Sequence, residues 1–291
     1  MSNLTKVGVL GATSHVGLAL LSKLTQDHYQ VFAFSRQNSH APINGVTWQA
    51  VANLSGGSDV ENNIPYWVSL SPIAILPDYF DALIAHGAKR IAILSSTSRF
   101  TKGQSSDPAD RALAQSFIDS EQRVQTWAES NGIEWVILRP TLIYGLGKDK
   151  NVCEIIRLIR RFGFFPLLGE AKGLRQPVHC RDVAHACHAA LFSSDATNKS
   201  YNLSGTEVLS YRTMVERLFL AIERKPRFIH VPLSLLRTGF VLLRLLPRYR
   251  HWSFSMAERM NQDMIFDHDD AKRDLNFQPQ AFVPDAGDLP S

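Results

Sequence analysis

Near its start the chain carries the sequence Val7-Gly8-Val9-Leu10-Gly11-Ala12-Thr13-Ser14-His15-Val16-Gly17. An apolar run enters a glycine turn and an amphipathic segment follows at once, which predicts a strand, a tight turn and a helix. Amide groups at the start of a helix lack partners within the helix and attract phosphate. Gly11 suits the tight turn and Gly17 the close packing of helix on strand, while Ser14 stands where a third glycine is usual. An ordinary strand-to-helix turn is the alternative. The pattern predicts a dinucleotide site whose phosphates lie against Gly11, Thr13, Ser14, His15, Val16 and Gly17.

Apolar runs alternate with amphipathic segments through the first two thirds of the chain. Such alternation indicates parallel strands joined by right-handed helical crossovers, and so an α/β fold with a Rossmann-type doubly wound parallel sheet. We predict strands at 6–11, 30–35, 47–51, 67–70, 90–95 and 134–139, and helices at 16–25, 78–86 and 110–131. Ligands of such sheets bind outside the carboxyl ends of the strands. The residues expected to converge there are Ser35, Asn53, Ser71, Thr97 and the loop after Arg139.

After residue 145 the alternation of apolar runs with amphipathic segments is less regular. It predicts helices at 151–161, 179–192 and 210–223, and strands at 200–203 and 227–231. We interpret residues 1–150 as a dinucleotide-binding core. Residues 151–291 are interpreted as a small mixed substrate-binding or cap region that also completes the sheet and is not an independent domain.

The stretch 231–252 is apolar but carries Arg237, Arg244, Arg248 and Arg250. Its uncharged runs are far shorter than the ~20 residues that a membrane-spanning helix needs. A helix packed on its own domain is the simpler interpretation. A peripheral membrane or protein contact through this stretch is the alternative.

Composition narrows the function classes. The 291 residues are 45% hydrophobic, and 31 Lys+Arg against 27 Asp+Glu give a net charge of +4 with no long block of like charge. A nucleic-acid-binding stripe is therefore not expected. Three cysteines without metal-ligand spacing, and a start that does not read as a signal peptide, favour a reducing compartment. The sequence is interpreted as cytoplasmic, and its oligomeric state is left open.

Further motifs follow the glycine turn in a fixed order along nearly the whole chain. They are Leu-Ser-Ser-Thr at 94–97, Leu-Arg-Pro-Thr-Leu-Ile-Tyr-Gly at 138–145, Arg-Gln-Pro-Val-His-Cys-Arg-Asp-Val at 175–183, Tyr-Asn-Leu-Ser-Gly at 201–205, and Phe-Asp at 266–267 with Ala-Lys-Arg-Asp-Leu at 271–275. With this ordered set the chain resembles an extended or atypical short-chain dehydrogenase/reductase of the NAD-dependent epimerase/dehydratase family. The resemblance implies a nicotinamide dinucleotide cofactor.

The second predicted strand ends in Ser35-Arg36, where an NAD-preferring enzyme of this fold commonly has an acidic residue for the ribose 2′-hydroxyl. A hydroxyl followed by a guanidinium suits a 2′-phosphate instead. We therefore favour NADP, with NAD as the alternative if Arg36 is merely a solvated residue. By resemblance, Asn53 meets the adenine. The remaining expected cofactor contacts are Ser71, Pro72, Ser95 and Pro140.

The family's catalytic groups are a Ser or Thr after the fifth strand and a Tyr and Lys four residues apart on the next helix. Thr97 matches the hydroxyl position, but Phe117 stands at the tyrosine and Glu121 at the lysine. Phenylalanine has no ionisable proton and glutamate is not a cation, so other groups must move the proton in any hydride transfer. The candidates are Thr97, Ser120, Glu121 and Tyr144.

On the substrate side, Arg175 matches the arginine that holds a nucleotide-sugar diphosphate in related epimerases, and Asn151 could contact the same group. A surface ion pair or a packing role is the alternative for Arg175. Leu142 departs from the family, which often has asparagine there. We expect Asp182 to cap the following helix and His179 to pack beneath the cleft. The histidines show no metal-ligand pattern.

The sequence is compatible with two alternative functions. The first is an NAD(P)-binding, nucleotide-sugar epimerase/dehydratase-like protein that acts on a small sugar-like substrate, with Thr97 polarising the substrate oxygen. The second is a non-catalytic NAD(P)-binding sensor, assembly factor or accessory subunit.

Overall fold

The computed structural model describes residues 4–36, 41–55, 63–231 and 259–290. Its centre is a seven-stranded sheet in the order β11-β6-β5-β4-β1-β2-β3, in which every neighbouring pair is parallel. The strands are β1 (Lys6–Leu10), β2 (Gln30–Ser35), β3 (Val46–Ala50), β4 (Tyr66–Ser69), β5 (Arg90–Leu94), β6 (Glu134–Pro140) and β11 (Lys199–Leu203). The predicted Rossmann-type doubly wound sheet is confirmed.

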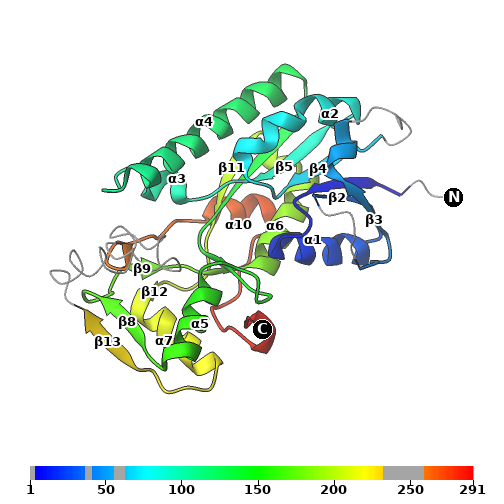
Figure 1. Cartoon of the computed structure of the whole chain (residues 1–291). Helices are drawn as coiled ribbons and strands as arrows, with labels where there is room; N and C mark the ends of the chain where they lie inside the picture. Colours follow the sequence, from blue (N-terminus) through cyan, green and yellow to red (C-terminus); the bar gives the residue numbers. More distant parts are fainter. Residues whose placement is uncertain (1–3, 37–40, 56–62, 232–258, 291) are drawn as a thin grey trace.

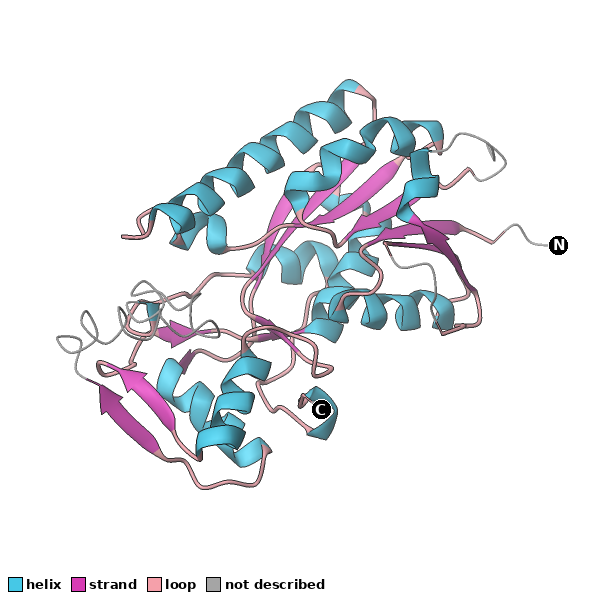
Figure 2. Ribbon diagram, viewed as in Figure 1, coloured by secondary structure: helices cyan, strands magenta, loops and turns pink. Residues whose placement is uncertain are grey.

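Helices cover both faces of this sheet (Figures 1 and 2). Helices α1 (His15–Gln26) and α6 (Cys180–Phe192) pack together on one face. Helices α2 (Phe80–Ala85) and α4 (Pro108–Ser130) lie on the other. Because both faces are covered, the central strands are apolar on both sides and form two core clusters that the sheet separates.

The order in which the chain adds strands to the sheet reverses between β1 and β4. The chain runs from β1 outward to β3, then returns to place β4 on the other side of β1. The crossovers on the two sides of this point leave in opposite directions, which opens a crevice at the carboxyl ends of β1 and β4. The glycine turn lies at this crevice, directly after β1.

The part of the chain beyond residue 150 contributes to two places. Strand β11, helix α6 and helix α10 (Asp269–Leu275) complete the layers of the large sheet. Helices α5 (Val152–Phe162) and α7 (Tyr211–Ala221) enclose a separate apolar cluster beside the pair β8 (Phe165–Leu168) and β13 (Phe228–Val231) (Figure 1). Two further short pairs are β7 (Ile143–Tyr144) with β10 (Val178–His179) and β9 (Leu174–Arg175) with β12 (Leu209–Ser210). The division at residue 150 remains an interpretation.

Element boundaries follow local chemistry. The helix predicted to begin at 78 begins at Phe80, because Pro77 lies in the preceding 3-10 helix Ile73–Tyr79. The helix predicted from 110 begins at Pro108, where the Asp107 side chain accepts from the amide of Ala109 and proline suits the first turn.

No helix among the described residues is long and apolar enough to span a bilayer. The stretch 231–252, for which a helix or a peripheral contact was predicted, lies outside the described residues after Val231.

Candidate active site

The glycine turn has the geometry that the sequence predicted. Gly11 follows β1 with a positive φ of 75°, and a Cβ there would lie 2.8 Å from the carbonyl carbon of Leu70. A Cβ on Gly17 would lie 2.4 Å from the carbonyl oxygen of Ala12. Ser14 caps α1, because its hydroxyl oxygen accepts from the amide of Gly17 at 3.0 Å. The side chain of Ser14 therefore shapes the turn, and the first amides of α1 remain directed at the crevice.

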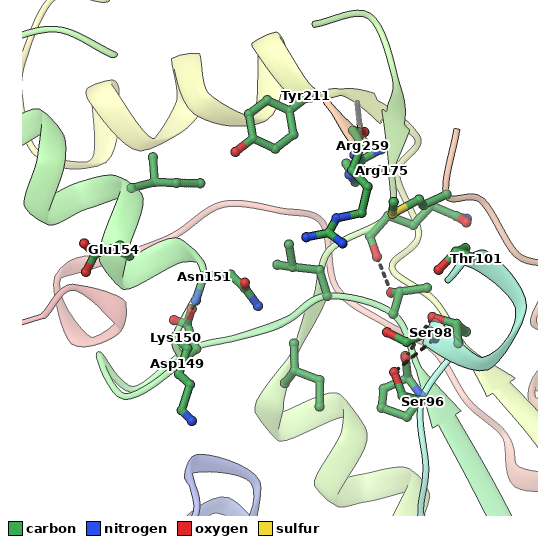
Figure 3. A pocket seen from close by; sticks show the side chains of 18 of the residues that line it. Ser96, Ser98, Thr101, Asp149, Lys150, Asn151, Glu154, Arg175, Tyr211 and Arg259 are labelled. Carbon is green, nitrogen blue, oxygen red and sulfur yellow. Dashed lines mark hydrogen bonds between the residues drawn. The ribbon is translucent and has the colours of Figure 1, made fainter. Parts of the chain in front are cut away.

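A cavity of about 940 Å³ runs from this turn into the part of the chain beyond residue 150. Thr13, Ser14 and His15 form one end, and Arg175, Tyr211 and Arg259 form the other. Between them lie two walls, one from Ser95 to Lys102 and one from Lys148 to Leu158 at the start of α5 (Figure 3). The cavity thus joins the dinucleotide turn to a cationic end.

His15 contributes a polar atom without a partner at the turn. Its Nε2 is buried and has no hydrogen-bond partner among the described residues. Burial lowers the pKa of His15 from its usual value, although nearby Asp149 raises it and His179 lowers it further. A neutral imidazole therefore lines the cavity beside the amides of α1 at neutral pH.

Arg175 is a buried cation at the far end of the cavity. Its guanidinium donates to the carbonyls of Leu174 and Gln262, each at 2.7 Å, and to the carbonyl of Arg259. It also lies over the ring of Tyr211, 5.5 Å from the centroid. Burial lowers the pKa of Arg175 to about 10, so it remains charged at neutral pH. Figure 3 shows the guanidinium pointing toward the middle of the cavity.

Asn151 lies on the opposite wall, exposed and directly before α5 (Figure 3). Asn151 is the N-cap residue of α5, but its side chain makes no cap bond; instead the Oδ1 of Asp149 accepts from the amides of Asn151 and Val152 at 2.9 and 2.6 Å. The side chain of Asn151 is thus not needed as a cap and faces the space that Arg175 enters.

The residues expected around the adenosine half lie along the carboxyl edge of the sheet and outside this cavity. Ser35 is buried at the end of β2 and Arg36 is exposed directly after it. Asn53 is exposed in the 3-10 helix Val51–Ser55, and Ser71 and Pro72 follow β4. Their roles toward a cofactor remain predictions.

The model of the family described as "NAD dependent epimerase/dehydratase family" matches residues 7–204. The chain belongs to this family.

Two curated proteins show partial similarity to this family member. One is the mitochondrial NADH dehydrogenase [ubiquinone] 1 alpha subcomplex subunit 9 of Arabidopsis thaliana, 31% identical over 100 residues, which are 34% of this chain and 25% of that protein. The other is UDP-glucose 4-epimerase of Vibrio cholerae, 24% identical over 115 residues, 40% of this chain and 35% of that protein. The matched segments thus span only about a quarter and a third of these relatives.

Solved epimerase structures share the fold over nearly the whole chain. An epimerase from Methanothermobacter thermautotrophicus has a TM-score of 0.74 at 13% identity, covering 96% of this chain and 89% of that one. UDP-glucuronic acid 4-epimerase from Bacillus cereus, solved in complex with NAD, has a TM-score of 0.72 at 13% identity, covering 98% and 94%.

Within this epimerase/dehydratase frame, Glu121 occupies a position outside the cavity. Its side chain is 1% exposed and accepts from the hydroxyl of Ser95 at 2.5 Å, from Arg139 Nη2 at 2.6 Å, and from Arg99. Phe117 packs half-buried against the core cluster on the α2/α4 face of the sheet. Ser120 is buried and does not line the cavity either.

Tyr144 is also directed away from the cavity. Its ring is 1% exposed and packs edge-on against His179 and Phe282, with its hydroxyl 3.4 Å from the carbonyl of Ala281. Burial raises the pKa of this phenol far above its usual value. The structure thus buries Tyr144 beside the paired strands β7 and β10, and buries Glu121 in its ion pairs with Arg99 and Arg139, so neither side chain lines the cavity.

Thr97 does line the cavity, but its hydroxyl is engaged. Its Oγ1 donates to the carbonyl of Pro140 at 3.1 Å, and its amide donates to the same carbonyl. Because its one proton is used, Thr97 can accept a hydrogen bond from a substrate hydroxyl but does not donate one. The hydroxyl of Ser96 accepts from the amide of Ser98 at 3.1 Å, which leaves its proton available to the cavity. Ser96 therefore offers the cavity a free hydroxyl proton, whereas the hydroxyl proton of Thr97 is engaged.

Helix α6 corrects a capping prediction. The cap is His179, whose Nδ1 accepts from the amide of Arg181 at 3.1 Å, while Nε2 contacts Asp288 at 3.0 Å. Asp182, expected to be the cap, instead accepts from the amide of Gln280. His179 is buried beneath the cleft, as predicted.

Four cationic residues of the cavity were not predicted as site residues from the sequence: Lys102, Lys148, Lys150 and Arg259. None lies in a motif of the set above. Lys102 and Arg259 share the carboxylate of Asp110, with Lys102 at 2.7 Å. Among the described residues, no group of three or more His, Cys, Asp or Glu side chains is arranged to hold a metal ion.

Proposed function

We propose that the chain binds NADP(H) and exchanges a hydride with a nucleotide-sugar-like alcohol or ketone, without the Tyr and Lys pair of its family. The observation that carries the proposal is the single cavity that connects the glycine turn with Arg175 and Asn151. A dinucleotide and an anionic second ligand can therefore meet in one cavity. The three cysteines are buried free thiols, which supports the cytoplasm as the location.

The residues present fit a dinucleotide. Gly11 and Gly17 leave the approach to α1 bare of side chains, since a Cβ at either position would collide with backbone atoms. The free Nε2 of His15 and the first amides of α1 lie at the same place and suit a pyrophosphate. When bound, the nicotinamide would supply or accept the hydride.

The far end of the cavity fits an anionic substrate. Arg175 is held rigid by carbonyl groups and retains its charge, and Lys148, Lys150 and Arg259 add cations around the same space. Rigid guanidinium groups bind diphosphate through charge-assisted hydrogen bonds. Ser96 would donate a hydrogen bond to a substrate carbonyl, and Thr97 would accept one from a substrate hydroxyl. The proton lost from the alcohol with its hydride, or gained by the reduced carbonyl oxygen, would pass through the Ser96 hydroxyl to water in the cavity. The Vibrio and Bacillus proteins named above act on UDP-sugars by their names, which supports a nucleoside diphosphate sugar here.

The test is turnover by the loaded protein. We expect the protein to convert at least one member of a panel of UDP-, GDP- and TDP-sugars. Chromatography of the products measures this conversion. Ser96→Ala should slow that conversion by about 10- to 100-fold while leaving dinucleotide affinity unchanged, because it removes one polarising donor. A wild-type protein that binds dinucleotide but converts no sugar would contradict the catalytic part of the proposal.

A second candidate is a dinucleotide-binding protein without redox turnover, such as an accessory subunit. It is favoured because Phe117 and Glu121 stand where the family has its Tyr and Lys, and neither of these two residues lines the described cavity. The Arabidopsis relative is named as a subunit of NADH dehydrogenase. Tight binding with no conversion, unchanged by Ser96→Ala, would support this candidate.

Arg36 is expected to decide between the two nicotinamide dinucleotides. Arg36→Ala should weaken NADPH binding by about 10- to 100-fold, because a charged hydrogen bond to phosphate contributes ~1.5–3 kcal/mol. NADH affinity should stay unchanged, since NADH has no 2′-phosphate. Fluorescence titration of both coenzymes measures the effect. Equal wild-type affinities for NADH and NADPH would refute the 2′-phosphate role.

His15 is expected to make dinucleotide binding depend on pH. Burial lowers its pKa in the free protein, and a phosphate placed beside it raises that pKa again. Binding therefore takes up a proton, and NADPH affinity should increase as the pH falls from about 8 to about 6. Titrations of wild type and His15→Gln give the His15 contribution by difference, which cancels the titration of the coenzyme's own phosphate. Identical pH profiles for the two proteins would show that His15 does not contact the anion.

A further inference from the structure

One wall of the cavity is a short segment with little hydrophobic support. We call residues 95–102 the hydroxyl wall, because most of its cavity-lining side chains carry hydroxyl groups. The residues of this wall that line the cavity are Ser95, Ser96, Thr97, Ser98, Thr101 and Lys102. It contains the four-residue helix α3 (Ser98–Thr101), which has no buried residue and no side-chain cap. Its one aromatic residue, Phe100, is half-exposed and meets the ring of Phe266 with 5.8 Å between centroids, so apolar packing contributes little to holding α3 in place.

Backbone bonds attach only the first part of the hydroxyl wall to the sheet. The amide of Ser95 donates to Leu138 and that of Thr97 to Pro140. Beyond Thr97, the described backbone bonds stay within the wall, such as Phe100 to Thr97 and Lys102 to Ser98, or join it to the next residues of the chain, as from Ser105 to Lys102. The position of α3 thus depends on side chains.

Glu121 supplies the buried side-chain contact. Its carboxylate accepts from Ser95 at the start of the wall and from Arg99 within α3, and it is itself held by two nitrogens of Arg139. Arg99 and Arg139 both lie over the ring of Phe100, 5.1 and 5.6 Å from its centroid. A second carboxylate of α4, Asp110, holds the other end through Lys102 at 2.7 Å.

We propose that Glu121 is a positioning residue: its carboxylate fixes the hydroxyl wall, and with it the groups that meet the dinucleotide and substrate. One negative charge faces two guanidiniums here, so losing it leaves Arg99 and Arg139 to repel each other beneath the wall. Of the measurements that test this inference, only NADPH affinity rests on the proposed function. A glutamate where the family has lysine is thus part of the support of the cavity and not a proton donor within it.

Glu121→Gln tests this, because glutamine can still accept from Ser95 but cannot balance the arginines. We expect hydrogen exchange of the amides of residues 95–102 to become faster, and NADPH affinity to fall by about 10-fold. The matched control is Glu134→Gln. Glu134 also pairs with an arginine, Arg90, at 2.8 Å, but at the opposite end of the same strands β5 and β6. The control should leave both the exchange of 95–102 and the affinity unchanged.

Unchanged exchange of 95–102 in Glu121→Gln would overturn the proposal. So would intact NADPH affinity with abolished turnover, since that pattern marks a proton-transfer group. If Glu121→Gln does not fold, Arg99→Gln removes the same ion pair through its less buried partner. This variant should show the same faster exchange of residues 95–102. If wild type binds no dinucleotide, the proposed function fails, while the exchange comparison still decides the role of Glu121.

Discussion

Gly17→Ala is expected to abolish dinucleotide binding, with an affinity loss greater than about 100-fold, equivalent to ~2.7 kcal/mol. The added Cβ would lie 2.4 Å from the carbonyl oxygen and 2.6 Å from the carbonyl carbon of Ala12. Backbone atoms cannot rotate away as a side chain can, so α1 must move off the glycine turn. That movement displaces the amides and His15 from the phosphate position. Stability should also fall by ~1–3 kcal/mol from overpacking.

Gly103→Ala is the matched control for this substitution. A Cβ on Gly103 meets no atom within 4 Å, and its φ lies outside the left-handed region. Binding and thermal unfolding of this variant should match wild type. Retained NADPH affinity in Gly17→Ala would show that the turn does not hold the dinucleotide.

Restoring the family's pair is expected to damage the protein and not to activate it. Phe117→Tyr/Glu121→Lys places a third cation between Arg99 and Arg139 and removes the carboxylate that pairs them. Breaking a buried ion pair costs ~3–5 kcal/mol. Because Glu121 is almost fully buried, water cannot screen the added charge. Thermal unfolding should therefore show a melting temperature lower by about 10 °C or more.

Phe117→Tyr alone serves as the control here. Phe117 is half-buried at the margin of its core cluster, and the added hydroxyl should change stability by less than about 1 kcal/mol. A double variant as stable as wild type, with newly gained sugar turnover, would contradict the structural role of Glu121.

The fold could be predicted because its signals are local. The turn between Leu10 and Gly17 and the alternation of short apolar runs with amphipathic segments are readable within windows of a dozen residues. Strand and helix ends differed by a few residues where caps decided them, as at Asp107 and Pro108. The candidate cofactor residues after β1, Thr13 to His15, line the cavity for the same local reason.

The rest of the site depends on contacts between distant parts of the chain. Glu121 pairs with Arg99 and Arg139, which are 22 and 18 residues away in the sequence. No local sequence pattern near Glu121 predicts these partners. Tyr144 belongs to a motif, yet its side chain is turned inward by Phe282, which lies far along the chain. Arg259 joins the cavity from a segment without a motif. Motifs thus located the cleft, but long-range packing determined which side chains face it.

Calorimetric titration of the purified protein with NADPH, after removal of any nucleotide that co-purifies, measures directly whether the glycine turn holds a dinucleotide. We predict saturable binding of one dinucleotide per chain that is lost in Gly17→Ala and kept in Gly103→Ala. Absence of binding heat for both NADPH and NADH, confirmed by absence of any fluorescence change, would contradict the assignment of the glycine turn as a dinucleotide site.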